Sequence, residues 1–125
     1  MATSKLPPGL HPDTLAVRAA VEKSQYGENA EALFLTSSFT QPDSETAARR
    51  FAGEEDGYIY SRFTNPTVAS MEMRLAAMEG TEACIAAASG MGAITAVMWT
   101  LLKAGDEIIT DKTLYGCTFA FFRHG

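Results

Sequence analysis

Three short segments of this 125-residue chain combine residue types that suit an anion or a flat ring as ligand. In the first, Ala88–Gly92, small residues stand where a predicted strand passes into a predicted helix. Free amides and a partial positive charge at a helix start favour phosphate or carboxylate. The alternative is that Ser89 only caps the helix and the glycines allow close packing. The segment carries neither the Gly-Lys-Ser/Thr of a P-loop nor the third glycine of a dinucleotide site.

The second segment, Tyr58–Phe63, is aromatic-rich and is predicted to be extended. In an extended chain Tyr60 and Arg62 point to the same side. A phenol beside a guanidinium forms a good grip for phosphate or carboxylate. The alternative is a surface arginine beside packed aromatic rings.

The third segment, Tyr115–Thr118, follows a second predicted strand. Ligands of open α/β sheets gather at the carboxyl ends of strands, so Tyr115 is placed to reach a site near Gly90. Its flat ring could stack on a ring cofactor. Alternatively, Tyr115 is a core residue beside a tight turn. Cys117 is either a reactive thiol or, more simply, a small apolar residue.

The elements that must position these segments form a predicted strand–helix–strand unit. Ala83–Ala87 and Glu107–Thr110 are the expected strands, and Met91–Lys103 is the helix between them. Such a unit predicts an α/β fold with a mainly parallel sheet. The helix is short of charge, so we expect it to be buried on more than one side.

Three further helices are predicted upstream, after a flexible arm over residues 1–10. The first spans Pro12–Lys23, and Ser44 is expected to cap a second at Glu45–Phe51. Asn65 is expected to cap the third, which is amphipathic and stops at Gly80.

Composition excludes several classes of partner. The formal net charge of -5 and the pI near 4.9 argue against nucleic acid and anionic membrane. Cys84, Cys117, His11 and His124 lack metal-ligand spacing, so no metal site is predicted and two free thiols are expected. The longest apolar stretch, Ala83–Leu102, is interrupted and does not fit a membrane span. No secretory signal is recognised, so a cytoplasmic location is expected.

The order and spacing of the segments resemble the Cys/Met-metabolism family of pyridoxal-phosphate (PLP) enzymes from about Thr14 onward. The family holds cystathionine γ-synthase, cystathionine lyases, methionine γ-lyase and acylhomoserine sulfhydrylases. The matching motifs are Tyr60-Ser61-Arg62, Asn65-Pro66-Thr67, Ser89-Gly90-Met91, Gly105-Asp106, and Tyr115-Gly116 with Thr118.

The resemblance implies a fold type I PLP-dependent transferase-like architecture. Residues 1–60 would be an N-terminal arm and dimer-contact segment, and residues 61–125 the truncated first part of the large PLP-binding domain. It also implies a homotetramer, built as a dimer of dimers with shared active sites, that acts on a small amino-acid substrate.

The resemblance further implies a role for five residues. Gly90 and Met91 would donate backbone N–H groups to the PLP phosphate. Tyr60 and Arg62 would reach the same phosphate from the neighbouring subunit. Tyr115 would stack on the pyridine ring and take part in catalysis as a proton carrier.

Within the family, Glu31–Phe39 together with Thr14–Arg18 resembles the O-succinylhomoserine sulfhydrylases. The expected reaction is γ-replacement on O-succinylhomoserine or O-acetylhomoserine with sulfide, giving homocysteine in methionine biosynthesis. Leu114–Phe121 instead resembles the methionine γ-lyases, in which a cysteine at the position of Cys117 lies near the substrate. γ-Elimination to 2-oxobutanoate, ammonia and methanethiol, or a cystathionine γ-synthase reaction in trans-sulfuration, therefore stays open.

The family's Schiff-base lysine and ring-nitrogen aspartate come downstream of the residues present here. None of the lysines stands in the family's lysine motif; they are Lys5, Lys23, Lys103 and Lys112. We therefore expect this chain alone to be inactive. A different alternative is a non-catalytic truncated chain that acts as an oligomerisation or phosphate-binding module.

Overall fold

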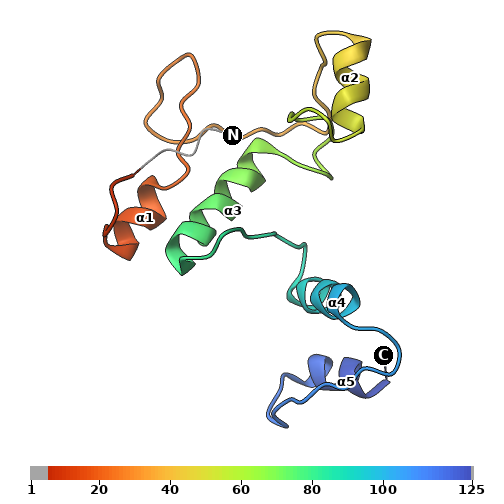
Figure 1. Cartoon of the computed structure of the whole chain (residues 1–125). Helices are drawn as coiled ribbons and strands as arrows, with labels where there is room; N and C mark the ends of the chain where they lie inside the picture. The colour runs from red at the N-terminus through yellow and green to blue at the C-terminus, as the bar shows by residue number, and fades with distance from the viewer. Residues whose placement is uncertain (1–5, 125) are drawn as a thin grey trace. The chain divides into compact units, whose positions relative to one another are not determined.

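The computed structural model describes residues 6–124, so residues 1–5 of the predicted arm lie outside the described part. Its elements are five helices (Figure 1). They are α1 (Pro12–Arg18), α2 (Ser44–Phe51), α3 (Pro66–Glu79), α4 (Gly90–Leu101) and α5 (Gly116–His124). The chain divides into two compact units, of which the first ends at Ile85 and the second begins at Ala86.

Helix α3 confirms the predicted helix and its end signals, but the side chains of its predicted apolar face are exposed: Val68, Met71, Leu75 and Met78. The Asn65 side chain accepts a hydrogen bond from the Thr67 amide at 2.8 Å, and Pro66 occupies the first turn. Gly80 ends the helix in the left-handed conformation, with φ of 67°. Because glycine lacks a Cβ, it adopts this conformation without strain.

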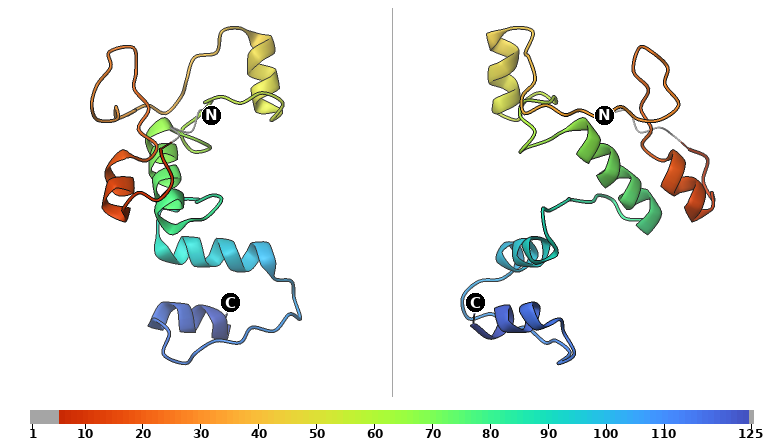
Figure 2. Two further views of the ribbon diagram at one scale, coloured as in Figure 1. Left: turned by 60° about the vertical axis from the view of Figure 1, so that its left-hand side comes forward. Right: turned by 180° about the vertical axis from the view of Figure 1, so that it is seen from behind.

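Helix α1 lies beside α3 in the first unit (Figures 1 and 2). Ser70 and Arg74 of α3 donate hydrogen bonds to the carbonyls of Ala20 and Ala19, both at 3.0 Å. Ala19 is buried, and Ala76 of α3 is buried as well. Polar side chains of α3 therefore bind the backbone that follows α1. Helix α1 ends at Arg18, earlier than the predicted end at Lys23.

Helix α2 begins one residue before the predicted position. Asp43 caps it, with its Oδ1 accepting from the Thr46 amide at 2.7 Å, and Ser44 is the first helical residue. The prediction of Ser44 as the cap was wrong. Because a carboxylate accepts a stronger hydrogen bond than a hydroxyl, Asp43 is the better partner for these amides.

No strand is assigned within residues 6–124, including the segments Ala83–Ala87 and Glu107–Thr110 that were expected to be strands. The β pairing found there is one antiparallel bridge between Ser38 and Tyr60. A strand needs hydrogen bonds to a neighbour, and these two apolar segments have no such ladder in the described part of the chain. The mainly parallel sheet therefore stays a prediction.

Helix α4 confirms the predicted position but not the predicted burial. It contains no buried residue, and Trp99 is 77% exposed. Helix α5 was not predicted, because its glycine, threonine and three phenylalanines have low helix propensity. Within the second unit α4 and α5 contact each other.

The predicted division at residue 60 concerns subunit contacts and stays a prediction. None of the described helices is long and apolar enough to cross a membrane.

Candidate functional site

The segment that carries Tyr60 and Arg62 pairs with the chain before α2. The Phe39 amide donates to the Ile59 carbonyl at 3.0 Å, and the Ser61 amide donates to the Ser37 carbonyl at 2.9 Å. These bonds flank the antiparallel bridge at Tyr60. The segment is therefore extended as predicted, and its geometry is held by backbone pairing.

Tyr60 and Arg62 lie together in the first unit. The Arg62 guanidinium carbon lies 5.5 Å from the centre of the Tyr60 ring and 5.4 Å from that of Phe63. Stacking on two rings orients the planar guanidinium, whose donors remain available. Arg62 forms no ion pair with any of residues 6–124, so its charge is open to an anionic ligand.

Asn65 anchors the far end of the same segment, a role that sequence reasoning missed. Besides capping α3, its amide donates to the Phe34 carbonyl at 3.0 Å and to the Ser61 hydroxyl at 2.9 Å. The Ser61 hydroxyl in turn donates to the Thr36 carbonyl. The Asn65 side chain is buried, so each of these bonds replaces water that cannot enter.

In the second unit, the start of α4 offers amides to a ligand. The Ser89 hydroxyl accepts from the Gly92 amide at 3.0 Å, which confirms Ser89 as a cap. α-Helix geometry leaves the amides of Gly90 and Met91 without a partner within the helix. A Cβ built on Gly90 meets no atom within 4 Å. The cap and an anion site are therefore compatible, because the cap uses a different amide.

Helix α5 contacts the start of α4 through Met91. The Thr118 hydroxyl, on a buried residue, donates to the Met91 sulfur at 3.6 Å. This contact brings the first turns of the two helices together. Gly90, Met91 and Tyr115 therefore belong to adjoining helix starts within one unit.

Tyr115 is 72% exposed and stands directly before α5. A side-chain hydrogen bond with Cys117 raises the pKa of the Tyr115 hydroxyl, and the charge of the thiolate adds to the shift. The phenol thus holds its proton more firmly than a free tyrosine. Both described cysteines are free thiols.

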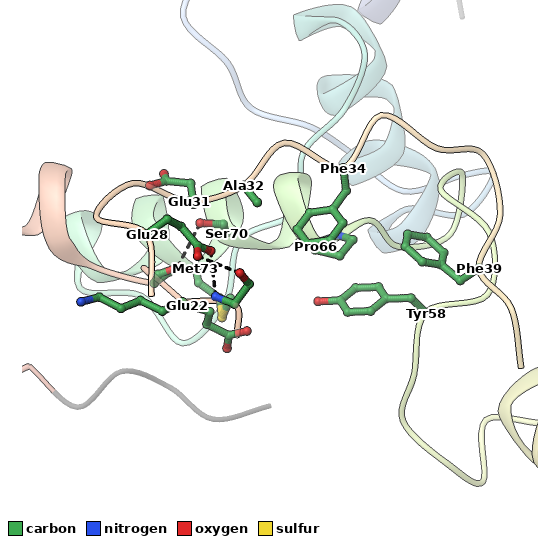
Figure 3. Close-up of a pocket in the computed structure, with 13 residues that line it drawn as sticks. Glu22, Glu28, Glu31, Ala32, Phe34, Phe39, Tyr58, Pro66, Ser70 and Met73 are labelled. Atoms are coloured by element: carbon green, nitrogen blue, oxygen red, sulfur yellow. Dashed lines mark hydrogen bonds between the residues drawn. The ribbon is translucent and has the colours of Figure 1, made fainter. Parts of the chain in front are cut away.

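A cavity of about 290 Å³ in the first unit lies outside these residues (Figure 3). Phe34, Phe39, Tyr58 and Pro66 line its aromatic end. Burial raises the pKa of Tyr58, with the charge of Glu22 as the smaller cause. None of the five predicted site residues lines this cavity.

The structure therefore arranges the predicted residues as two groups. Tyr60 and Arg62 form a cationic, aromatic pair in the first unit. Gly90, Met91 and Tyr115 gather at two helix starts in the second unit. Each group suits an anion or a flat ring, and each is described within its own unit.

Comparison with known proteins gives a family. The sequence model of the Cys/Met metabolism PLP-dependent enzymes matches residues 13–125. An L-methionine gamma-lyase of Fusobacterium nucleatum subsp. nucleatum is 53% identical over 112 residues, which is 90% of this chain and 28% of the relative. An O-succinylhomoserine sulfhydrylase of Pseudomonas aeruginosa is 48% identical over 110 residues, 88% of this chain and 27% of the relative. The chain thus spans less than a third of the length of these relatives.

A solved structure is also similar to this chain. A crystal structure from Campylobacter jejuni subsp. jejuni, described as an O-acetylhomoserine (thiol)-lyase with N'-pyridoxyl-lysine-5'-monophosphate, matches with a TM-score of 0.86 and 30% identity. The match covers 93% of this chain and 29% of that chain.

Proposed function

Because the chain belongs to the Cys/Met metabolism PLP-dependent enzymes, we propose that the whole protein catalyses γ-replacement on an acylated homoserine with sulfide, giving homocysteine. The acyl donor is O-succinylhomoserine, or alternatively O-acetylhomoserine. The observation that carries the proposal is the likeness of Glu31–Phe39 to the O-succinylhomoserine sulfhydrylases. In the structure this segment pairs with the Tyr60 segment, so it borders residues of the candidate site.

The residues present fit the PLP phosphate. A phosphate dianion needs donors that are not already paired, and it is best held by a guanidinium and helix-start amides. Arg62 has no ion pair among the described residues, and the Gly90 and Met91 amides have no intrahelical acceptor. In the proposed dimer, Tyr60 and Arg62 bind the phosphate of the neighbouring subunit while Gly90 and Met91 bind that of their own.

When bound, PLP supplies an electron sink for charge that develops on the amino-acid substrate. In the proposed site the Tyr115 ring covers one face of the cofactor, which orients it and excludes water from that face. The Tyr115 hydroxyl holds its proton firmly because Cys117 raises its pKa. The protonated phenol can therefore donate a hydrogen bond beside the cofactor.

The apolar surface supports association with further protein. The described residues with buried apolar side chains are Ala19 and Ala76, whereas Trp99, Ile85 and Ile109 are exposed. Large apolar side chains left exposed in this way are suited to contact with further protein. We propose a dimer of dimers with shared active sites, in the cytoplasm.

A second candidate function is methionine γ-lyase activity. The Fusobacterium and Pseudomonas putida relatives named L-methionine gamma-lyase are 53% and 55% identical to this chain. Cys117, within hydrogen-bonding reach of Tyr115, also fits the pattern that resembles those enzymes. The two candidate reactions differ in what intercepts a common activated substrate.

Product analysis of the whole protein tests the two candidates. With O-succinylhomoserine and sulfide, we expect homocysteine to form, and the yield should depend on sulfide. The control is L-methionine as substrate, from which the proposed enzyme should release little methanethiol. Absence of homocysteine, together with 2-oxobutanoate and methanethiol from methionine, would contradict the sulfhydrylase and support the γ-lyase.

The phosphate site is tested separately by Arg62→Ala. Loss of a charge-assisted hydrogen bond costs about 1.5–3 kcal/mol, which corresponds to a roughly 10- to 150-fold weaker retention of PLP. Equilibrium dialysis of PLP measures this directly. Unchanged retention would remove Arg62 from the site while leaving the family assignment intact.

A further inference from the structure

Arg50 of helix α2 bonds residues on both sides of the helix in sequence, Gln41 before it and Glu55 after it. The Arg50 side chain is 21% exposed, and its Nε donates to Glu55 Oε1 at 3.1 Å. Its Nη1 donates to Gln41 Oε1 at 2.8 Å. The guanidinium is thus held on two sides, by the acidic loop after α2 and by the chain before it.

Gln41 links Arg50 to the backbone by hydrogen bonds. Its Nε2 donates to the carbonyls of Phe39 and Tyr58, both at 3.0 Å. One side chain therefore joins the two paired segments at the end opposite to Asn65. The rings of Phe39 and Tyr58 also lie beside each other, with centroids 5.4 Å apart (Figure 3).

Arg50 decides which way the Gln41 amide faces. An arginine side chain only donates hydrogen bonds, so it requires the oxygen of the amide. The nitrogen then faces the two carbonyls, which require a donor. A flipped amide would place its nitrogen against the guanidinium and its oxygen against both carbonyls, and three hydrogen bonds would be lost at once.

Gly57 makes room for this arrangement. A Cβ built on Gly57 would lie 2.6 Å from both Cδ and Cζ of Arg50. Atoms do not approach that closely, so any side chain at position 57 would displace the guanidinium. The glycine thus serves the close approach of Arg50 and not a positive φ, which its backbone does not have.

We propose that Arg50 and Gln41 are positioning residues that set the Tyr60–Arg62 segment for phosphate binding. This proposal rests on the proposed function of Tyr60 and Arg62. Gln41 fixes the carbonyl of Tyr58, two residues before Tyr60, and Asn65 fixes the other end. Binding groups need placement to within about 0.5 Å, which a backbone held at both ends supplies.

The first test compares Arg50→Ala with Arg49→Ala in the whole protein. Arg49 is the matched control, because it also bonds Glu55 but its other partners are Glu45 and Thr46 on its own helix. We expect Arg50→Ala to weaken PLP binding about tenfold and Arg49→Ala to change it by less than about twofold. Equal effects of the two variants would overturn the proposal.

Pyridoxal, which lacks the phosphate, separates positioning from general damage. A defect transmitted through the phosphate grip weakens PLP binding and leaves pyridoxal binding unchanged in Arg50→Ala. A merely structural role of Arg50 would weaken the binding of both compounds alike, and that result would overturn the proposal.

A second pair of variants keeps the test decisive if Arg50→Ala folds poorly. Gln41→Glu retains an acceptor for Arg50 but cannot donate to the two carbonyls, so it should lose PLP affinity as Arg50→Ala does. Gly57→Ala should also weaken PLP binding, because its Cβ would displace the Arg50 guanidinium. Normal PLP affinity in Gln41→Glu or in Gly57→Ala would contradict the proposal.

Arg62→Ala distinguishes the two proposals. If it leaves PLP affinity unchanged, the proposed phosphate site fails. If it weakens PLP binding while Arg50→Ala and Gln41→Glu do not, the phosphate site stands and the positioning role is wrong.

Discussion

The two units hold their candidate residues in different ways. In the first unit, side chains bond to backbone far away along the chain, as Asn65 does to Phe34. In the second unit, hydrogen bonds such as that from Gly92 to Ser89 are local, and Thr118 to Met91 bridges the two helices. Side chains that bind a ligand are therefore positioned by tertiary contacts, whereas the amides at a helix start are positioned by the helix itself.

The largest expected effect on stability comes from Asn65→Ala. This change removes the cap of α3 and the bonds to Phe34 and Ser61, so it should cost about 2–4 kcal/mol in the free energy of unfolding. Urea unfolding of the whole protein measures the loss. Asn65→Ser keeps a cap acceptor without the amide donor and should fall between Asn65→Ala and the unmodified protein; a loss as large as that of Asn65→Ala would show that the cap contributes little.

Ser89→Ala tests the corresponding cap of the second unit. It removes one local bond, from the Gly92 amide, so it should cost about 1 kcal/mol in the same unfolding experiment. A loss as large as that of Asn65→Ala would mean that Ser89 also supports distant chain. The contrast between the units would then disappear.

The C-terminal end of α3 gives a further contrast between two glycines. Gly80→Ala forces a Cβ into a backbone with φ of 67° and should destabilise the protein by about 1 kcal/mol. Gly116 begins α5 in open space and without positive φ, so Gly116→Ala should be neutral or slightly stabilising. Thermal unfolding of the two variants checks the order. Because both glycines have open space around them, equal effects would show that φ does not govern the difference.

The smallest expected effect is a shift in a titration. Cys117→Ala removes the hydrogen bond that raises the Tyr115 pKa, so that pKa should fall back toward 10.0. Because the raised pKa favours the protonated phenol in the folded state, its contribution to stability is present below pH 10 and is lost as the pH rises beyond it. Tyrosinate absorbance against pH measures the shift, with Tyr115→Phe to identify the residue. If the pKa of Tyr115 is the same in Cys117→Ala as in the unmodified protein, Cys117 does not raise it.

Much of the local structure was predictable because its signals are adjacent in sequence. Asn65, Pro66 and Gly80 mark both ends of α3, and the alternation in Tyr58–Phe63 placed Tyr60 beside Arg62. The strands predicted on either side of α4 are not seen in residues 6–124. A strand depends on a neighbour that its own residues do not specify. Helix α5 was missed for the related reason that low propensity can be overridden by context; Arg123 and His124 in its last turn were a usable signal.

The amino-acid sequence by itself determined the caps of α3 and α4, the open amides at Gly90 and Met91, and the family, since each depends on residue types at short spacing. Only the tertiary structure decided that Asn65 reaches Phe34 and that Arg50 lies against Gly57. The physical reason is distance along the chain. A side chain's own residue type limits which bonds it can make, but the fold chooses the partner by bringing distant backbone within reach.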